Sequence, residues 1–282
     1  MKQVTFNAPL NEKADIFQRM NNNPPSWWDK LIGLNGVYVE IRKRNRIHVY
    51  YEGGRIAELR VDEGKMSTTC HPKYLGIAVS GEHPKYIDCS NQLDKDPSFI
   101  LKKIEEEYSQ KKKDSNPEDI SETKIKGDLI TKGNTLYIDS EFAHSFIYKN
   151  EKISIRFDLV EISDNRIRIV ELKRIKDGRL RSSVDEKSEI LEQMAHYKAF
   201  IKEFHDEILK YYKTLYKIKQ SLGLPVPPCD LNCLQLDKNP HLLIKNTYQK
   251  SSKGRNDRVD AIKRILKGVS YEITPEYIKY VK

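Results

Sequence analysis

Three residues able to support metal-assisted chemistry lie close together in the middle of the chain. Asp158 is followed by Glu171 and then, two positions later, by Lys173. All three fall within residues 153–173, where two runs rich in Ile, Val, Leu and Phe flank an Asp-Asn pair at 164–165. Such a pair between strand-like runs favours a tight hairpin turn, so the segment predicts two antiparallel strands.

Pairing around this turn predicts which side chains meet. Asp158 is expected opposite Glu171, and Arg156 opposite Lys173. Because side chains alternate between the two faces of a strand, the two acids and the lysine should share one face. The other face is expected to form a core of Ile155, Phe157 and Leu159 against Val170 and Leu172, with Glu161 facing Arg168 on the same side nearer the turn.

Two carboxylates and an ammonium group between apolar strands are costly to bury unless they are used. Mg²⁺ would use them, because it prefers carboxylate oxygens and leaves positions open for water and phosphate oxygens. Lys173 could then orient a water and stabilise charge on a phosphate. The alternative is a buried structural network of ion pairs among Asp158, Glu171, Arg156 and Lys173.

The order Asp158, then Glu171-Leu172-Lys173 on the next strand, resembles the signature of PD-(D/E)xK nucleases. Phe157 stands where that signature usually has proline. The resemblance implies an α/β, restriction-endonuclease-like core and hydrolysis of phosphodiester bonds with Mg²⁺ or Mn²⁺. It also implies that Asp158, Glu171 and the backbone carbonyl of Leu172 are the metal ligands.

Gln193 and Tyr197 extend the resemblance. They lie one turn apart on an expected helix, which opens with a capping box at 183–186 and runs from 184 to about 221. This pair is similar to the QxxxY motif of the RecB-like branch, where it lies beside the active site and would position the site or the nucleic acid. The alternative is purely structural: Tyr197 packs in the core and Gln193 lies on the surface.

The resemblance also implies a further acid upstream of the hairpin, often supplied by a helix. Glu141 is the candidate for this catalytic role and Asp139 the reserve. Both lie in a run at 135–142 that reads as strand rather than helix, and both could be ordinary surface residues.

The elements that must position these residues predict a mixed α/β chain in two parts. A β-rich module is expected over 1–110, a polar linker over 110–117, and the nuclease-like domain over 118–282. After the long helix, strands are expected at 231–236, 242–244 and 269–273, with a helix at 258–266 between the last two.

The first module is expected to contain a three-stranded meander over 36–61, and a helix should follow at 97–113. Its first turn gathers four basic residues beside strand tyrosines. These could grip a nucleic-acid backbone, although a solvated turn is at least as good an explanation. The four are Arg42, Lys43, Arg44 and Arg46.

Composition narrows the classes of partner. The chain has 282 residues and a net charge of +9, which favours an anionic partner such as nucleic acid. It contains no apolar run long enough for a membrane span and no apolar leader, so no membrane partner and a cytoplasmic location are expected. The four cysteines are unevenly spaced and do not suggest a disulfide framework.

The sequence therefore predicts a metal-dependent nuclease with nucleic acid, DNA above all, as substrate, and leaves a homodimer open. One alternative is a protein that keeps the nuclease-like fold but only binds nucleic acid or another protein. Another is an interaction protein whose hairpin charges are structural.

Overall fold

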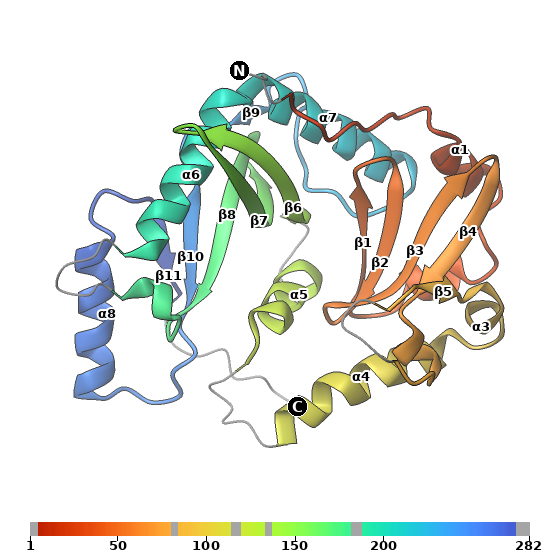
Figure 1. The fold of residues 1–282 in the computed structure, drawn as a ribbon, viewed down its shortest axis with the longest axis horizontal. Helices are drawn as coiled ribbons and strands as arrows, with labels where there is room; N and C mark the ends of the chain where they lie inside the picture. The colour runs from red at the N-terminus through yellow and green to blue at the C-terminus, as the bar shows by residue number, and fades with distance from the viewer. Residues whose placement is uncertain (1–4, 80–83, 114–119, 133–136, 182–187, 275–282) are drawn as a thin grey trace.

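The computed structural model describes residues 5–79, 84–113, 120–132, 137–181 and 188–274. Two β-sheets lie side by side, each with its own helices (Figure 1). The chain is a mixed α/β protein in which one sheet is antiparallel and the other is mixed, as expected from the sequence. Among these residues, none of the helices has the length and apolar character that a membrane span requires.

The first sheet has five antiparallel strands in sequential order. The expected meander over 36–61 supplies the first three, and its first turn has left-handed residues at Arg44 (φ 63°) and Asn45 (φ 56°). The strands are β1 (Val37–Arg42), β2 (Arg46–Tyr51), β3 (Gly54–Asp62), β4 (Lys65–Cys70) and β5 (Ile87–Asp88). The helices around them are α1 (Asp15–Asn22), α2 (Trp28–Ile32), a 3₁₀ turn η1 (Pro72–Leu75), α3 (Ser90–Lys95) and α4 (Pro97–Lys113), the last as predicted.

The second sheet has six strands, ordered β11-β10-β8-β7-β6 with β9 beside β8. β6, β7 and β8 are antiparallel, whereas β9, β10 and β11 join in parallel. The strands are β6 (Tyr137–Tyr148), β7 (Glu151–Ser163), β8 (Arg166–Arg174), β9 (Gln235–Leu236), β10 (His241–Lys245) and β11 (Tyr271–Ile273). The helices are α5 (Glu122–Lys132), the 3₁₀ turn η3 (Gly178–Leu180), α6 (Glu189–Glu203), α7 (His205–Ser221) and α8 (Lys253–Ile265).

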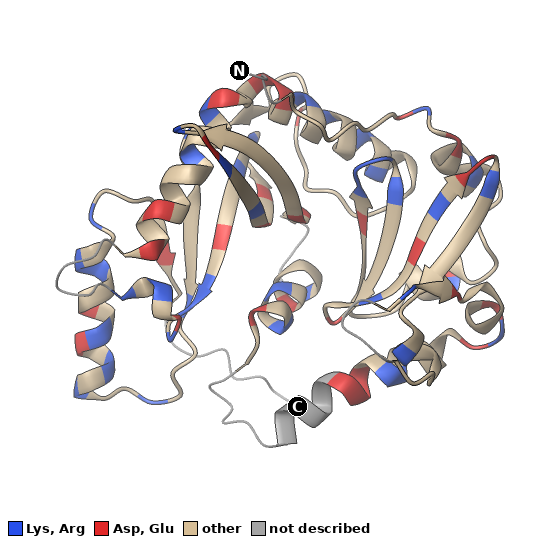
Figure 2. Cartoon of the chain, viewed as in Figure 1, with Lys and Arg blue, Asp and Glu red and all other residues tan. Residues whose placement is uncertain are grey.

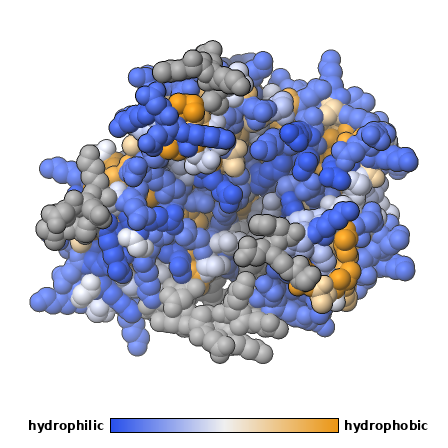
Figure 3. Space-filling model, in the orientation of Figure 1, coloured by the Kyte–Doolittle hydropathy of each residue, from blue (hydrophilic) through white to orange (hydrophobic). Residues whose placement is uncertain are grey.

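Helices cover both faces of this sheet. On one face Ile125 of α5 packs with Leu159, Val170 and Leu172. On the other face Phe200 of α6 belongs to the large core that also contains strand residues of the first sheet. The surface in Figure 3 is mostly hydrophilic, with apolar residues in small separate patches.

The predicted hairpin is present as β7 and β8, turning at Asp164 (φ 51°) and Asn165 (φ 57°). Its pairing ends at Leu159 opposite Val170. The predicted pairings of Asp158 with Glu171 and of Arg156 with Lys173 are therefore wrong: beyond this point Glu171 and Lys173 pair with Leu242 and Ile244 of β10, and Arg156 pairs with Ala143 of β6. The strands diverge at this point, which opens the end of the hairpin.

The predicted composition of the hairpin's core face is also partly wrong. Leu159 packs with Val170 and Leu172, but Ile155 and Phe157 lie in the large core on the other face. The alternation breaks where Glu141 of β6, with a left-handed backbone (φ 55°), lies between the pairs Ser140–Leu159 and Phe142–Phe157. A left-handed residue within a strand redirects its neighbours, as β-bulges do.

Two further predictions need correction. The long helix expected to about residue 221 is two helices, α6 and α7, separated at Phe204, and its capping box at 183–186 lies outside the described residues. The strand expected at 231–236 is reduced to Gln235–Leu236. The strands expected at 242–244 and 269–273 are present as β10 and β11, and the helix expected at 258–266 is α8, which begins five residues earlier.

Helix α5 also touches the first sheet, at the turn between β2 and β3. Gly53 lies so close to Thr123 that an added Cβ would be 2.5 Å from its Cγ2. Gly127, one turn further along α5, faces the backbone of Glu52 and Gly53. Lys124 completes the contact with an ion pair of 3.0 Å to Glu52. Only glycine allows this approach, because a side chain at Gly53 (φ 89°) would meet both backbone strain and Thr123.

Candidate active site

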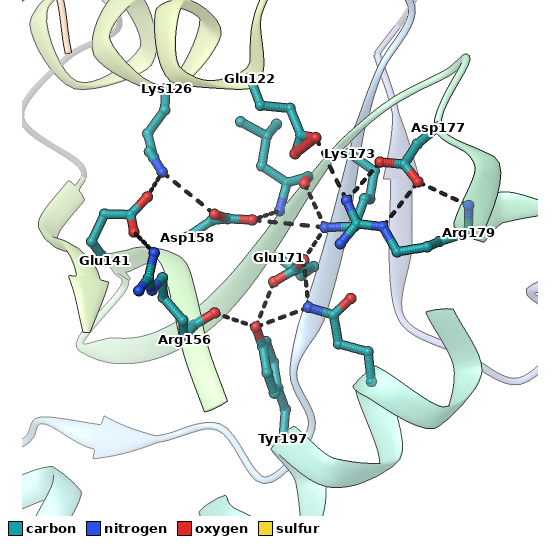
Figure 4. Close-up of polar contacts among 12 residues, drawn as sticks. Glu122, Lys126, Glu141, Arg156, Asp158, Glu171, Lys173, Asp177, Arg179 and Tyr197 are labelled. Atoms are coloured by element: carbon teal, nitrogen blue, oxygen red, sulfur yellow. Dashed lines mark hydrogen bonds and ion pairs between the residues drawn. The ribbon is translucent and has the colours of Figure 1, made fainter. Parts of the chain in front are cut away.

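The residues selected from the sequence meet where β7 and β8 diverge (Figure 4). α5 contributes to the cluster from one side and α6 from the other. Hydrogen bonds and ion pairs link six of them, from β6, β7, β8 and α6: Glu141, Asp158, Glu171, Lys173, Gln193 and Tyr197.

Asp158 lies at the mouth of the cluster, with its side chain 18 % exposed. Its Oδ2 accepts a hydrogen bond from the backbone N–H of Leu172 at 3.0 Å, which fixes the carboxylate against β8. Its Oδ1 is 3.4 Å from Nζ of Lys126, and its Oδ2 is 4.0 Å from Nζ of Lys173. The carboxylate thus lies between two ammonium groups.

Glu171 and Lys173 lie deeper, both almost fully buried. The Lys173 Nζ donates to Glu171 Oε1 and to the backbone carbonyl of Leu172, the latter at 3.1 Å. This ammonium group therefore touches both remaining oxygen donors predicted to hold a metal. Its position between them is the one from which a lysine could act on a ligand bound at the same oxygens.

Gln193 and Tyr197 both reach Glu171 from α6. Gln193 Nε2 donates to Glu171 Oε1 at 2.7 Å and to the Tyr197 hydroxyl at 3.1 Å, and that hydroxyl lies 2.7 Å from Glu171 Oε2. The alternative that put Gln193 on the open surface does not hold, since its amide is bonded inside the cluster. The one-turn spacing brings both side chains onto a single carboxylate, one to each oxygen.

The contacts of the Tyr197 hydroxyl indicate the protonation state of Glu171. The tyrosine hydroxyl has one proton, yet it contacts both Glu171 Oε2 and the carbonyl oxygen of Arg156. A carbonyl can only accept, so when the hydroxyl donates to it, Glu171 must carry the proton of the second bond. Burial raises the pKa of Glu171 to about 7, with repulsion from Asp158 adding to the rise and Lys173 opposing it.

Glu141 joins the cluster from β6. Its side chain forms ion pairs with Lys126 of α5 and, at 3.4 Å, with Arg156. It contacts Asp158 indirectly, through the shared Lys126. Asp139, the reserve candidate, has no part in the site: it is buried and binds Arg42 of β1 at 2.6 Å.

Sequence reasoning missed several charged residues of the site. Glu122 at the start of α5 approaches from the helix side, and its pKa is raised by burial and by Asp158, with Lys173 opposing. Arg179 of η3 is held by Asp177 and lies 3.7 Å from Glu122. The resemblance implied an additional acid supplied by a helix upstream of the hairpin, and Glu122 lies in such a helix, α5.

Mg²⁺ or Mn²⁺ is the metal that the sequence implies at Asp158, Glu171 and the Leu172 carbonyl. Among residues 5–79, 84–113, 120–132, 137–181 and 188–274, no three His, Cys, Asp or Glu side chains form a metal-binding group. Mg²⁺, however, is often held by only one or two carboxylates, with water and phosphate oxygens completing its shell. Asp158, Glu171 and the Leu172 carbonyl are hard oxygen donors of this kind, so they fit Mg²⁺ or Mn²⁺ chemically. An ion there would replace ammonium contacts made by Lys126 and Lys173.

Comparison of the chain with protein-family models, with curated proteins and with solved structures finds no match. The function is therefore argued from the geometry and chemistry of the site itself.

Proposed function

We propose that the chain is a metal-dependent nuclease that hydrolyses phosphodiester bonds in nucleic acid, with DNA as its main substrate, on a restriction-endonuclease-like PD-(D/E)xK core. One observation carries the proposal: Gln193 and Tyr197, chosen only by their resemblance to the RecB-like motif, bind the two oxygens of Glu171. A motif from a separate helix thus converges on the acid of the Glu-x-Lys strand. A core helix without a role at this site would have no reason to deliver both polar groups there.

In this proposal Asp158, Glu171 and the Leu172 carbonyl hold Mg²⁺ or Mn²⁺. The ion supplies Lewis acidity toward the phosphate and lowers the pKa of a bound water. Lys173 orients the attacking water and stabilises charge that develops on the phosphate. Gln193 and Tyr197 fix the orientation of Glu171, and Glu122 or Glu141 serves as the additional acid.

A second candidate is a protein that binds nucleic acid without cutting it. It is favoured by the contacts of Lys126 with Glu141 and Asp158, because these ion pairs compensate the carboxylates without any metal. Structural ion-pair networks also perturb pKa values, so the raised pKa of Glu171 does not separate the two functions.

The deciding experiment incubates the full chain with plasmid, linear duplex, single-stranded DNA and RNA, in Mg²⁺, Mn²⁺ or EDTA. Cleavage should require the metal and should disappear in Lys173→Met. Lys152→Met, an exposed lysine on β7, is the matched control and should cut normally. Thermal melts of both variants verify that the fold persists. Cleavage in EDTA, or undiminished cleavage by a folded Lys173→Met variant, would refute the proposal.

A further inference from the structure

A cavity of about 370 Å³ lies between the N-terminal lobe, built on the first sheet, and the second lobe, built on the second sheet, beside the candidate active site. The β1–β2 turn of the first sheet forms one wall, and β6 and α7 form the other. The lining residues that matter here are Arg42, Lys43, Arg44, Arg46, Glu141 and Tyr211. Neither the hairpin nor the α6 motif lines this cavity, which meets the candidate site at Glu141.

The β1–β2 turn, which forms one wall, is rich in Lys and Arg (Figure 2), so the lining carries a surplus of positive charge. Two of its cations are compensated: Arg42 by Asp139, and Arg46 by Glu58 at 3.1 Å. Lys43 and Arg44 are exposed, and within the described part of the chain neither forms an ion pair. The cavity therefore has two cations available to an anionic ligand.

The turn that presents these cations is fixed in place. The backbone N–H of Arg44 donates to the carbonyl of Pro9 at 3.3 Å, and Asn45 Oδ1 accepts from the N–H of Asn11 at 2.8 Å. These two hydrogen bonds hold the turn against the N-terminal segment. A cationic turn held this way loses little conformational entropy when it binds a ligand.

Arg42, which lines the cavity, also carries an unused donor. Nη2 of Arg42 is buried and has no hydrogen-bond partner, although Nη1 of the same group binds Asp139. A buried N–H group without a partner is costly. A ligand oxygen entering the cavity would satisfy it, and phosphate oxygens suit guanidinium donors particularly well.

Contacts of Glu141 run without a break from the cavity lining to the candidate active site. This residue lines the cavity and also contacts Lys126, which contacts Asp158. A polyanionic strand that occupied both places would have one phosphate at Asp158 and a neighbouring one at the β1–β2 turn. A single small anion would not need this continuity.

We propose that this cavity binds the backbone phosphate of a nucleic-acid strand next to the phosphate held at Asp158 and Glu171. The inference rests on the proposed function and gives the N-terminal module a role in it. The module binds the nucleic-acid strand that is hydrolysed at the site on the second sheet. Lys43 and Arg44 supply the charge, and Arg42 supplies a further donor.

The test measures binding without cleavage, by fluorescence anisotropy in EDTA. The probes are a fluorescein-labelled 20-base-pair duplex DNA and a 20-nucleotide single strand. The variant Lys43→Gln/Arg44→Gln is compared with Lys202→Gln/Lys267→Gln, which removes the same charge from exposed positions away from the cavity. Thermal melts of the two variants should agree.

Loss of this phosphate contact should lower the slope of log K against log salt by about 0.7 for the single strand and about 0.9 for the duplex. At 0.1 M salt this corresponds to roughly 5-fold to 8-fold weaker binding. The control should keep the native slope. Equal slopes and equal affinities for the two variants would overturn the inference.

Cleavage in Mg²⁺ is then measured with protein in excess over DNA. Below saturation the cavity variant should cut more slowly than Lys202→Gln/Lys267→Gln, in proportion to its weaker binding. If no protein cuts any substrate while the cavity variant still binds more weakly than the control, the nuclease proposal fails and the phosphate-binding cavity stands.

Discussion

Lys219 of α7 should be one of the most sensitive positions in the protein. Its side chain is only 6 % exposed, and its Nζ donates to Glu40 Oε2 at 3.1 Å and to the Ile138 carbonyl at 2.7 Å. These bonds join the first strand of one sheet to the first strand of the other. Lys219→Met would remove the nearest cation from the Glu40 carboxylate, itself 2 % exposed, and leave Ser140 at 2.8 Å and Arg42 at 3.9 Å beside it.

Breaking one partner of a buried ion pair costs about 3–5 kcal/mol, because the remaining charge stays desolvated. At roughly 2–4 °C per kcal/mol, Tm should fall by about 6–20 °C. The pKa of Glu40 supports the assignment: burial raises it, but Lys219 and Arg42 outweigh burial and lower it overall. Urea and thermal unfolding at pH 7 measure the loss.

Lys217→Met is the matched control on the same helix, since Lys217 is 54 % exposed and its ion pair with Glu12 is long, at 3.6 Å. It should cost no more than about 1 kcal/mol. The double variant Lys219→Met/Glu40→Gln should recover most of the loss, because no unpaired charge remains. If Lys219→Met melts with Lys217→Met, or if the double variant is less stable than the single one, the ion pair does not act as described.

Two further predictions concern the candidate site. The pKa of Glu171 is raised from 4.5 to about 7, so its neutral form stabilises the fold below pH 4.5, and this contribution is lost as pH rises through 7. In EDTA, the free energy of unfolding of Glu171→Gln should therefore rise by about 3 kcal/mol relative to that of the native protein between pH 4.5 and pH 8. For the exposed control Glu203→Gln the difference should stay constant. A difference for Glu171→Gln that does not vary with pH would contradict this. Lys126→Met should bind Mn²⁺ at least about fivefold more tightly in a calorimetric titration, because a like charge about 4 Å away costs about 1 kcal/mol even in bulk water. Lys132→Met on the same helix is its control, and equal affinities would show that Lys126 does not compete with the ion.

The sequence predicted those parts of the fold that depend on local chemistry. The hairpin followed from its Asp-Asn turn, and the shared contact of Gln193 and Tyr197 followed from helical spacing. The break between α6 and α7 carried no such signal, because Phe204 is neither Gly nor Pro and is itself buried. The apolar spacing runs through it unchanged, since both helices bury their stripes in the same core.

The other parts of the site that could not be predicted depend on tertiary contacts. Lys126 reaches Asp158 only because α5 crosses the sheet, and Arg179 reaches Glu122 only because η3 folds back to it. The left-handed Glu141 is a further example. Glutamate has no preference for that conformation, so nothing in the local pattern marks the position where β6 changes the faces of its neighbours.

The close approach between α5 and the β2–β3 turn links the two lobes mechanically. Gly53 and Gly127 leave no slack at this contact, so the helix must follow the turn when one sheet rotates against the other. The same helix carries Lys126 to Asp158, three residues from the contact with Thr123. A rotation of one sheet against the other would therefore change the separation between the Lys126 ammonium group and the Asp158 carboxylate, and with it the charge balance of the site.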